Sequence, residues 1–326
     1  MIEGTVDAQF TTISEAARGC HCIVGATALQ IAAPSIAERM GIPYVFVAYC
    51  PAVLPSRHHA PPVLAMRGDA PVKLDDYTEL WETDRARWME PWAALLNDHR
   101  ARFGLPPVDD VRSHVHTSHP WLAADNVLAP WPVSNTESVF QSGAWILRDD
   151  RPLAPEVERF LDAGAPPVYF GFGSIRAPRE VSRVMIESAR AVGRRVILSR
   201  GWAELSLVDE GSDCLAIGEV NQQALFQRVS AVVHHGGAGT TTAAARAGVP
   251  QVVVPQHYDQ HYWAARVEEL GVGVAHSPST PTTETLAAAL ERVLAPSVSA
   301  RAQVIGGKVS DDGALIAARR LVSVAG

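Results

Sequence analysis

Long apolar runs and a surplus of basic residues are both missing from this sequence of 326 residues. No apolar run approaches the ~18–20 residues that a membrane-spanning helix needs, and the first ten residues do not resemble a signal peptide. The 28 Lys and Arg are outnumbered by 35 Asp and Glu, and a net charge of −7 would repel nucleic-acid phosphates. We expect a cytoplasmic protein without stable membrane insertion and without a nucleic-acid partner.

Cysteine is also scarce. The four residues are Cys20, Cys22, Cys50 and Cys214. A single C-x-C pair does not complete a zinc site, and four cysteines are too few for a disulfide framework, so we expect free thiols. His257 and His261 have the i, i+4 spacing of a zinc-binding helix, but the glutamate of the H-E-x-x-H pattern is absent. We therefore expect no metal site and no bound cofactor.

The remaining composition is that of a globular protein with two domains. Hydrophobic residues make up 47% of the chain, and 24 Gly and 23 Pro supply frequent turns. In the first half, residues 20–26 and 42–49 have the pattern of buried strands and residues 28–40 that of a helix, which predicts a parallel βαβ unit. A proline-rich loop over residues 50–71 precedes tryptophans at helical spacing in residues 77–103.

A clean alternation of strands and helices restarts after a stretch rich in Gly and Pro, so we place the domain boundary near Leu147. The domains are residues 1–147 and 148–326. The predicted strands of the second domain are residues 168–172, 195–200, 214–218, 231–235 and 251–255. This alternation predicts an α/β class with doubly wound parallel sheets, which bind ligands beyond the carboxyl ends of their strands.

Glycine and histidine gather at two of these strand ends. The sequence GFGS places Gly171, Gly173 and Ser174 after one strand. The sequence HHGGAGTT places His235 and three glycines where another strand gives way to a helix. Free backbone N–H groups and the positive helix end suit a diphosphate there, although neither the Walker A pattern nor G-x-G-x-x-G is present. After the next strand, Asp259 and Gln260 could bind sugar hydroxyls.

HHGGAGTT, GVPQVVVPQ at residues 248–256 and the following Asp259–Gln260 pair resemble the donor-binding signature of GT-B glycosyltransferases of the UDP-glycosyltransferase type. The resemblance extends over nearly the whole chain. Segments 119–125, 143–153, 167–174, 194–205, 217–226 and 266–276 are similar to the glycosyltransferases of glycopeptide antibiotic biosynthesis, of the vancomycin and teicoplanin type.

The resemblance implies a GT-B fold, in which two Rossmann-like domains face each other across a cleft. The N-terminal domain would bind the acceptor and the C-terminal domain the nucleotide-sugar donor. The implied enzyme is an inverting, metal-independent hexosyltransferase. It would move a sugar, with glucose or N-acetylglucosamine favoured, from UDP or TDP to a hydroxyl of a glycopeptide aglycone. Relatives that use deoxyaminosugars have a similar Asp-Gln pair.

The resemblance also assigns roles to residues. Those implied for the diphosphate are Ser174, His235, Gly237, Ala238, Gly239 and Thr240. Those implied for the nucleoside are Arg200, Trp202, Glu219, Val220 and Asn221, and those for the sugar are Asp259 and Gln260. On the acceptor side, the loop over residues 50–71 offers His58, His59 and Asp69.

One departure concerns the start of the chain. Family members open with a strand and a GSRGD-type loop whose aspartate is the proposed catalytic base, and this sequence enters the pattern after that loop. At ~30 residues per βα unit, the difference corresponds to about 60–80 residues. We therefore expect an N-terminal domain that is incomplete at its start, in a fragment or mis-started version of a longer enzyme, and the catalytic base is unknown. The alternative is a rebuilt domain in which another residue acts as base.

Three other functions fit parts of the pattern. A nucleotide-sugar binding module without transfer activity would need only the donor half. A nucleotide-sugar 2-epimerase would share the architecture but needs acid–base carboxylates that the donor half does not offer. An NAD-dependent oxidoreductase is the weakest alternative, because no strand is followed by G-x-G-x-x-G.

Overall fold

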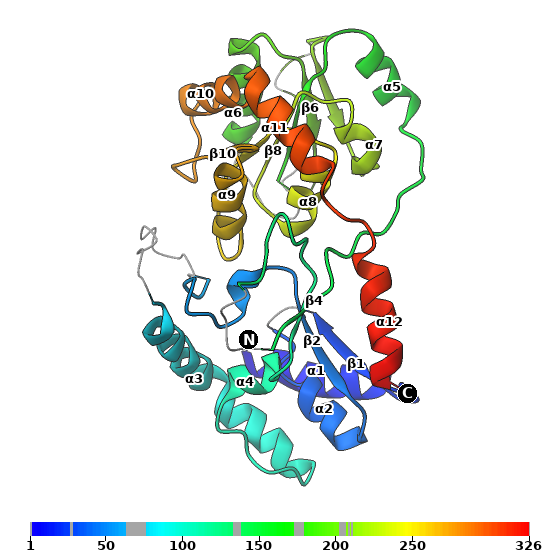
Figure 1. The fold of residues 1–326 in the computed structure, drawn as a ribbon, viewed down its shortest axis with the longest axis vertical. Helices are drawn as coiled ribbons and strands as arrows, with labels where there is room; N and C mark the ends of the chain where they lie inside the picture. Colours follow the sequence, from blue (N-terminus) through cyan, green and yellow to red (C-terminus); the bar gives the residue numbers. More distant parts are fainter. Residues whose placement is uncertain are drawn as a thin grey trace. The chain divides into compact units, whose positions relative to one another are not determined.

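The computed structural model describes residues 2–26, 29–62, 76–132, 138–172, 179–201, 207, 209 and 211–325 (Figure 1). The described chain divides into two compact units. The first holds the described residues up to Ile146 together with those of Ser310–Gly326, and the second those of Leu147–Val309.

The first unit is a parallel four-stranded sheet with helices on both faces. Its elements are α1 (Ile2–Ala16), β1 (Ile23–Ala26), α2 (Ala33–Met40), β2 (Tyr44–Ala48), the 3-10 turn η1 (Pro51–Val53), α3 (Thr78–Arg102), α4 (Val111–His116), β3 (Trp121–Leu122), β4 (Phe140–Gln141) and α12 (Gly313–Ala325). The strands lie in the order β1-β2-β3-β4, and Ile23 pairs with Tyr44 in parallel register. The predicted βαβ unit is thus confirmed as β1-α2-β2.

Helix α12 packs on the first sheet, although the sequence-based division assigned residues 148–326 as a whole to the second domain. Ala317, Leu321 and Val324 form an apolar stripe on α12 that covers Val45 and Trp121. At the start of the helix, a Cβ on Gly313 would lie only 2.4 Å from the carbonyl oxygen of Ala144. The last turns of the chain are therefore part of the first hydrophobic core.

The second unit is a six-stranded parallel sheet. Its elements are α5 (Pro155–Asp162), β5 (Val168–Gly171), α6 (Arg179–Ala191), β6 (Val196–Ser199), β7 (Cys214–Ile217), α7 (Gln222–Phe226), β8 (Ala231–His234), α8 (Ala238–Arg246), β9 (Gln251–Val253), α9 (Gln260–Glu269), β10 (Gly273–Ala275), α10 (Thr283–Val293) and α11 (Pro296–Gly306). The strand order is β10-β9-β8-β5-β6-β7. Read from β7, this is the 3-2-1-4-5-6 order of a doubly wound sheet.

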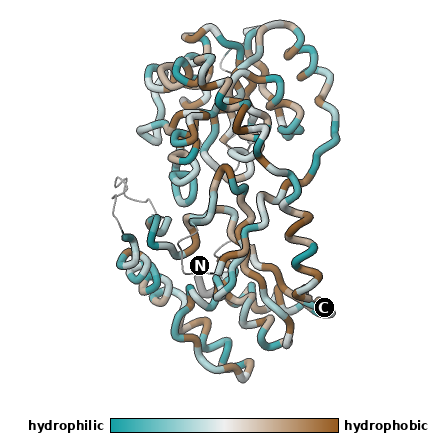
Figure 2. Tube along the Cα trace, viewed as in Figure 1, coloured by the Kyte–Doolittle hydropathy of each residue, from teal (hydrophilic) through white to brown (hydrophobic). Residues whose placement is uncertain are grey.

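Both faces of this sheet are buried, which explains the nearly continuous apolar strands. On one face, Phe170 and Val233 pack with Met185 of α6 and Leu290 of α10. On the other face, the alternate strand residues pack against α5, α7 and α8. Val232, for example, belongs to the same cluster as Phe226 of α7 and Ala244 of α8. The trace coloured by hydropathy shows apolar and polar residues interspersed along α12 of the first unit, as expected for a helix with one covered face (Figure 2).

Some elements, or parts of them, were not expected from the sequence. The sequence looks helical over residues 13–18, but helix α1 begins well before them, and Val6 and Phe10 are buried on it. Their spacing of four residues is the helical signal that could have shown its first turns. Strand β10 is a sixth strand beyond the five predicted, and three residues are too few for a period to be recognised. The segment over residues 77–103 forms one helix, α3, with Pro91 inside it.

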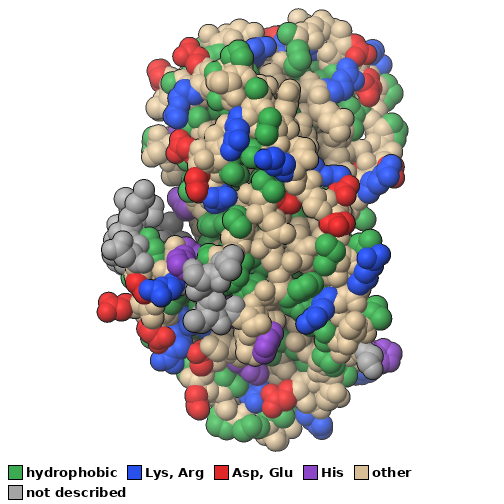
Figure 3. Space-filling view, in the orientation of Figure 1, with side chains coloured by type: hydrophobic (Ala, Val, Ile, Leu, Met, Phe, Trp, Pro, Cys, Tyr) green, Lys and Arg blue, Asp and Glu red, His purple; other side chains and the backbone are tan. Residues whose placement is uncertain are grey.

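The described surface carries charges of both signs. Lys, Arg, Asp and Glu side chains are interspersed on the face that Figure 3 shows, which agrees with the modest net charge of −7. None of the helices in the described ranges is both long enough and apolar enough to cross a lipid bilayer.

Asp125 connects the first sheet to the start of the C-terminal segment. Its carboxylate is 2% exposed and accepts hydrogen bonds from the backbone N–H groups of Val127 (2.8 Å), Leu128 (3.1 Å) and Ser310 (3.0 Å). Because bonds to a buried charged group contribute more than neutral ones, this side chain holds a turn and the chain leading to α12 together.

We expect Asp125→Ala to lower the free energy of unfolding of the first unit by about 2–4 kcal/mol, because three N–H groups lose their buried, charged acceptor. The measurement is urea unfolding followed by tryptophan fluorescence, since six of the eight tryptophans lie in this unit. Asp109→Ala, at an exposed position, is the matched control and should change the value by less than about 0.5 kcal/mol. Equal effects of the two substitutions would contradict this role of Asp125.

Candidate functional site

The sheet of the second unit reverses its winding between β5 and β8. These strands are neighbours, with Gly171 opposite His234, although they are far apart in sequence. From β5 the chain proceeds to β6 and β7 on one side, and it returns to build β8, β9 and β10 on the other. The loops that leave such a pair diverge and open a crevice at the carboxyl edge, where doubly wound sheets bind their ligands. His235 and the glycines that follow it lie in one of these two loops.

His234, the last residue of β8, is buried and holds the loop after its own strand. Its Nδ1 accepts the backbone N–H of Gly236 at 3.1 Å, and its Nε2 lies 2.9 Å from Oε1 of Gln251. Burial, together with the neighbouring His235, lowers the pKa of His234 to about 3, so the ring is neutral. The sequence analysis missed this residue. Because side chains alternate along a strand, two adjacent histidines are expected to face opposite sides, and this pattern could have separated His234 from His235.

Gly236 brings this loop against the start of α9. Its φ of +93° lies in the left-handed region, and a Cβ there would lie 2.8 Å from Cγ1 of Val253 and 3.1 Å from the backbone oxygen of Gln260. Only glycine fits so close an approach without strain. The structure therefore brings the HHGG segment and the Asp259–Gln260 pair together, as the sequence analysis expected.

His235 follows His234 and is only partly buried. Its Nδ1 is buried and has no hydrogen-bond partner among the described residues. Burial, and to a lesser degree the nearby His257, lowers the pKa of His235. A Cβ on Gly237 would lie 2.7 Å from Nε2 of His235, so the glycine makes room for the imidazole. A buried ring nitrogen without a partner indicates a ligand or water as its partner.

Helix α8 begins beside this ring. Gly237 is its N-cap and has no side chain to accept their hydrogen bonds, so the first N–H groups of the helix, at Ala238, Gly239 and Thr240, are open to an anion. Gly239 is exposed, and a Cβ there would have nothing within 4 Å. The hydroxyl of Thr241, by contrast, donates to the carbonyl oxygen of Gly237 at 2.9 Å and serves the helix.

Asp259 and Gln260 begin α9 at the neighbouring strand end. The carboxylate of Asp259 is partly buried, which raises its pKa, and Nε1 of Trp263 donates to it at 3.3 Å. Oε1 of Gln260 accepts the backbone N–H groups of Gln256 (2.8 Å) and His257 (3.2 Å). The oxygen of Gln260 is thus used by the loop, and its Nε2 is the atom that could donate to a sugar hydroxyl.

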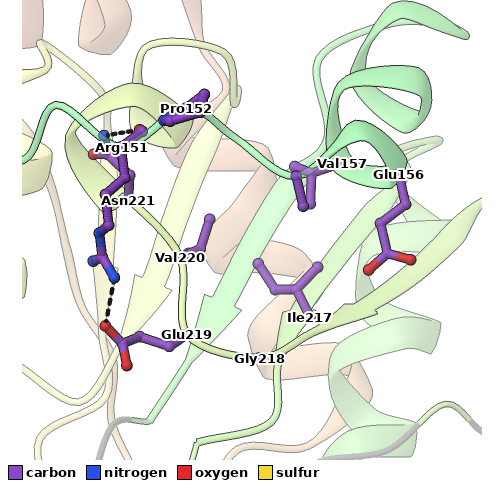
Figure 4. A pocket seen from close by; sticks show the side chains of 10 residues that line it. Arg151, Pro152, Glu156, Val157, Ile217, Gly218, Glu219, Val220 and Asn221 are labelled. Atoms are coloured by element: carbon purple, nitrogen blue, oxygen red, sulfur yellow. Dashed lines mark hydrogen bonds and ion pairs between the residues drawn. The ribbon is translucent and has the colours of Figure 1, made fainter.

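On the other side of β5, the ends of β6 and β7 lie side by side. Arg200 is exposed, and its backbone N–H donates to Ile217 at 2.9 Å. A pocket of about 200 Å³ opens beyond β7 (Figure 4). Its lining residues are Arg151, Pro152, Ala154, Glu156, Val157, Ile217, Gly218, Glu219, Val220 and Asn221. Three predicted nucleoside residues, Glu219, Val220 and Asn221, thus line one cavity with residues 151–157, to which the sequence analysis gave no role in the site.

Asn221 serves the fold with its whole side chain. Its Oδ1 caps α7 by accepting the N–H of Ala224 at 3.0 Å, and its Nδ2 donates to the carbonyl oxygens of Asp149 (2.9 Å) and Arg151 (2.7 Å). Figure 4 shows Arg151 reaching Glu219, with which it forms an ion pair of 3.0 Å. The side chain of Asn221 therefore positions the loop, and a nucleoside would meet the loop's backbone.

The acceptor-side residues lie in the first unit. The ring of His59 is within 3.0 Å of the carbonyl oxygen of Leu54 through Nε2, and it contacts Trp81 and Trp131 edge to face. Burial lowers the pKa of His59. These contacts give His59 a packing role, whereas the adjacent His58 is exposed.

Three predicted site residues, Ser174, Trp202 and Asp69, lie outside the described residues. All four cysteines are free thiols, as expected. Within the described ranges, no three His, Cys, Asp or Glu side chains are grouped so that they could hold a metal ion.

Comparisons with known proteins agree with this architecture. A family model for the C-terminal domain of proteins like erythromycin biosynthesis protein CIII matches residues 183–312. Glycosyltransferase GtfE of Amycolatopsis orientalis is 52% identical over 324 residues, which cover 99% of this chain and 79% of the relative. The vancomycin aglycone glucosyltransferase of the same organism is 52% identical over 318 residues, 96% of this chain and 77% of the relative. Its dTDP-epi-vancosaminyltransferase is 44% identical, with coverages of 91% and 72%.

Solved structures show the same fold at low sequence identity. The glycotransferase of kitacinnamycin superposes with a TM-score of 0.71 at 19% identity, over 98% of this chain and 80% of that chain. Glycosyltransferase VinC in complex with dTDP superposes with a TM-score of 0.65 at 21% identity, over 99% and 79%. With its two parallel sheets and these relatives, the chain belongs to the GT-B glycosyltransferases of vancomycin-type glycopeptide biosynthesis.

Proposed function

We propose that this protein transfers a hexose, glucose or N-acetylglucosamine, from UDP or dTDP to a hydroxyl of a glycopeptide aglycone, with inversion and without a metal. The relatives' printed activities support the reaction class and the aglycone. The observation that supports the donor site best is the unpartnered, buried Nδ1 of His235 beside the open N-terminus of α8. The cytoplasmic location expected from the sequence is part of the same proposal.

The order of the strands supports the assignment of the donor's three parts. The predicted nucleoside residues follow β6 and β7, the diphosphate residues follow β5 and β8, and the sugar residues follow β9. Along the edge from β7 to β9 there are four strand steps of ~4.8 Å, or ~19 Å in all. An extended nucleotide sugar has a comparable length, with its diphosphate in the middle.

The chemistry of the transfer explains why the diphosphate needs this site. The acceptor oxygen bonds to the anomeric carbon, the bond from that carbon to the phosphate oxygen breaks, and the nucleoside diphosphate leaves with the electron pair. One in-line displacement inverts the anomeric centre, and the acceptor proton passes to a base. Developing negative charge on the leaving oxygen would be stabilised by the N–H groups of Gly237–Thr240, the helix dipole and His235.

The first test is calorimetric titration of the chain with UDP and dTDP in the presence of EDTA. We expect binding, weakened at least about tenfold in His235→Ala, because the substitution removes the ring that would contact the diphosphate. His276→Ala is the matched control, since that histidine is also in the second unit but bonds to Pro278 and Thr285. Absence of nucleotide binding by a folded sample would refute the donor-site assignment.

Transfer itself is measured separately, by mass spectrometry of vancomycin aglycone incubated with UDP-glucose, dTDP-glucose or UDP-N-acetylglucosamine. We expect a product heavier by one sugar, formed equally well with EDTA. Nucleotide binding without any product would favour the binding-module alternative. A donor isomerised without an acceptor would instead indicate an epimerase, and a requirement for a divalent cation would contradict the metal-independent mechanism.

Gly239 offers a test of where the diphosphate lies. Because Gly239 is exposed and a Cβ would meet no atom, Gly239→Ala should leave the free protein as stable as before, or more stable by about 0.5–1 kcal/mol, since alanine favours a helix. If the phosphates approach this backbone, the added methyl group should nevertheless weaken UDP or dTDP binding about tenfold or more. Unchanged affinity in a stable variant would place the phosphates elsewhere.

The lowered pKa of His235 predicts a pH dependence of donor binding. In the free protein, burial holds the pKa of His235 below 6.5, and a bound diphosphate would raise it. Binding then takes up a proton, so affinity should increase as the pH falls through the pKa of the complex and decrease as the pH rises through it. Calorimetry at several pH values measures this change in nucleotide affinity. In His235→Asn, the contribution of the imidazole to the pH dependence should disappear.

The comparison with His235→Asn is needed because other ionisable groups are close to the ring or belong to the ligand. His257 contributes to the lowered pKa of His235, burial lowers the pKa of His261, and the terminal phosphate of the nucleotide has a pKa of about 6. These groups contribute equally to both proteins. Identical pH profiles for the wild type and the variant would contradict the proposed contact.

A further inference from the structure

Two buried side chains behind the diphosphate loop form a network that the reaction itself does not require. His234 and Gln251 are both 0% exposed, on the neighbouring strands β8 and β9. Building on the proposed function, we propose that His234 is a positioning residue. It holds the N–H of Gly236, thereby fixes the loop from β8 to α8, and so sets where His235 and the first turn of α8 meet the donor diphosphate.

The hydrogen bonds determine which nitrogen of His234 carries the proton. Gly236 approaches Nδ1 with its N–H, which can only donate, so Nδ1 must be unprotonated and accept. The neutral ring then has its proton on Nε2. Nε2 therefore donates to the side chain of Gln251, which must present its oxygen at 2.9 Å. Only this arrangement of protons forms both hydrogen bonds of the ring, and it makes the Gly236 bond depend on Gln251.

This arrangement leaves a polar group unsatisfied. With its oxygen turned to His234, Gln251 has its Nε2 amide buried without a partner in the described part of the chain. A buried amide without a partner is unfavourable, and an apolar pair at these two positions would fill the same space without it. The network therefore has a purpose other than stability, and the group that it orients is the N–H of Gly236.

The loop needs such a restraint because of its conformation. Gly236 has a φ of +93° and lies against Val253 and the backbone of Gln260. A glycine with a free N–H can leave this conformation easily, since glycine has access to most of the allowed backbone space. If the bond to His234 were lost, Gly237 and His235 would no longer be held at the head of α8, and a ligand would have to order them on binding.

Two isosteric substitutions separate positioning from mere space filling. In His234→Asn, the side-chain oxygen can take the place of Nδ1 and accept the N–H of Gly236. In His234→Gln, the longer amide takes the place of Nε2 and reaches Gln251, but nothing accepts from Gly236. Both remove the imidazole and both place an amide in the core. A purely structural role predicts similar losses in the two variants.

We expect His234→Gln to weaken UDP or dTDP binding about tenfold and His234→Asn to change it less than about threefold, at similar melting temperatures. The probe is calorimetric titration with each nucleotide, and donor KM should rise more than kcat falls. Amide hydrogen exchange of Gly236, measured by NMR on 15N-glycine-labelled protein without nucleotide, should accelerate in the Gln variant and not in the Asn variant. Equal nucleotide affinities of the two variants would overturn the proposal.

A measurement on the unsubstituted protein decides the matter if either variant fails to fold. The 15N shifts of the His234 ring report its tautomer at neutral pH. A proton on Nε2 supports the proposal, and a proton on Nδ1 overturns it, because Gly236 could not then donate to that nitrogen. If the wild-type chain binds neither nucleotide, the proposed function fails and the donor role of His234 fails with it, whereas nucleotide binding with equal variants refutes the positioning role alone.

Discussion

The reversal of strand order between β5 and β8 is the constraint on which the rest of the second unit depends. Because the strands are parallel, every loop that follows a strand emerges at the same edge, and doubly wound sheets bind their ligands where the strand order reverses. The reversal lies in the middle of the edge, with two strands on either side of β5 and β8. A ligand with a charged centre and a group at each end could place its centre at β5 and β8 and its two ends at the strands on either side. The site is thus a property of the sheet before it is a property of any residue.

Two histidines that are adjacent in sequence, His234 and His235, have different surroundings in the structure. His234 ends β8 with its ring buried, and His235 follows it with its side chain only partly buried. The inner ring is fully hydrogen-bonded, while the outer ring has a nitrogen without a partner among the described residues. Under the proposed function, the sequence HHGG therefore contains both the diphosphate contact and its support. The glycines permit the close approach, and the inner histidine removes the freedom that the glycines bring.

The sequence predicted the elements whose apolar residues are β-branched and continuous, such as β5, β8 and the pair β1 and β2. The sequence did not predict where α12 packs. The apolar stripe of Ala317, Leu321 and Val324 indicates that one face of the helix is buried, but it does not identify the sheet against which that face packs. The sequence analysis missed β10, which is too short to have a period. For the site, the sequence indicated which residues lie at the strand ends better than it indicated what each side chain does. The place of Asp259 and Gln260 after a strand can be read from neighbouring residues, whereas the hydrogen-bond partners of a side chain depend on the folded structure.

Asn221 and Gln260 illustrate that difference. Both belong to motif segments, and both use side-chain atoms to hold backbone: Asn221 donates to two carbonyl oxygens of the segment before α5, and Gln260 accepts two N–H groups of the loop before α9. In each case the side chain fixes the backbone of a loop at the candidate site. Apart from proline, which lacks the N–H, a substitution leaves the backbone groups of its residue in place. A residue can therefore be indispensable to ligand binding while touching only the protein, and a substitution that abolishes binding does not by itself identify a contact.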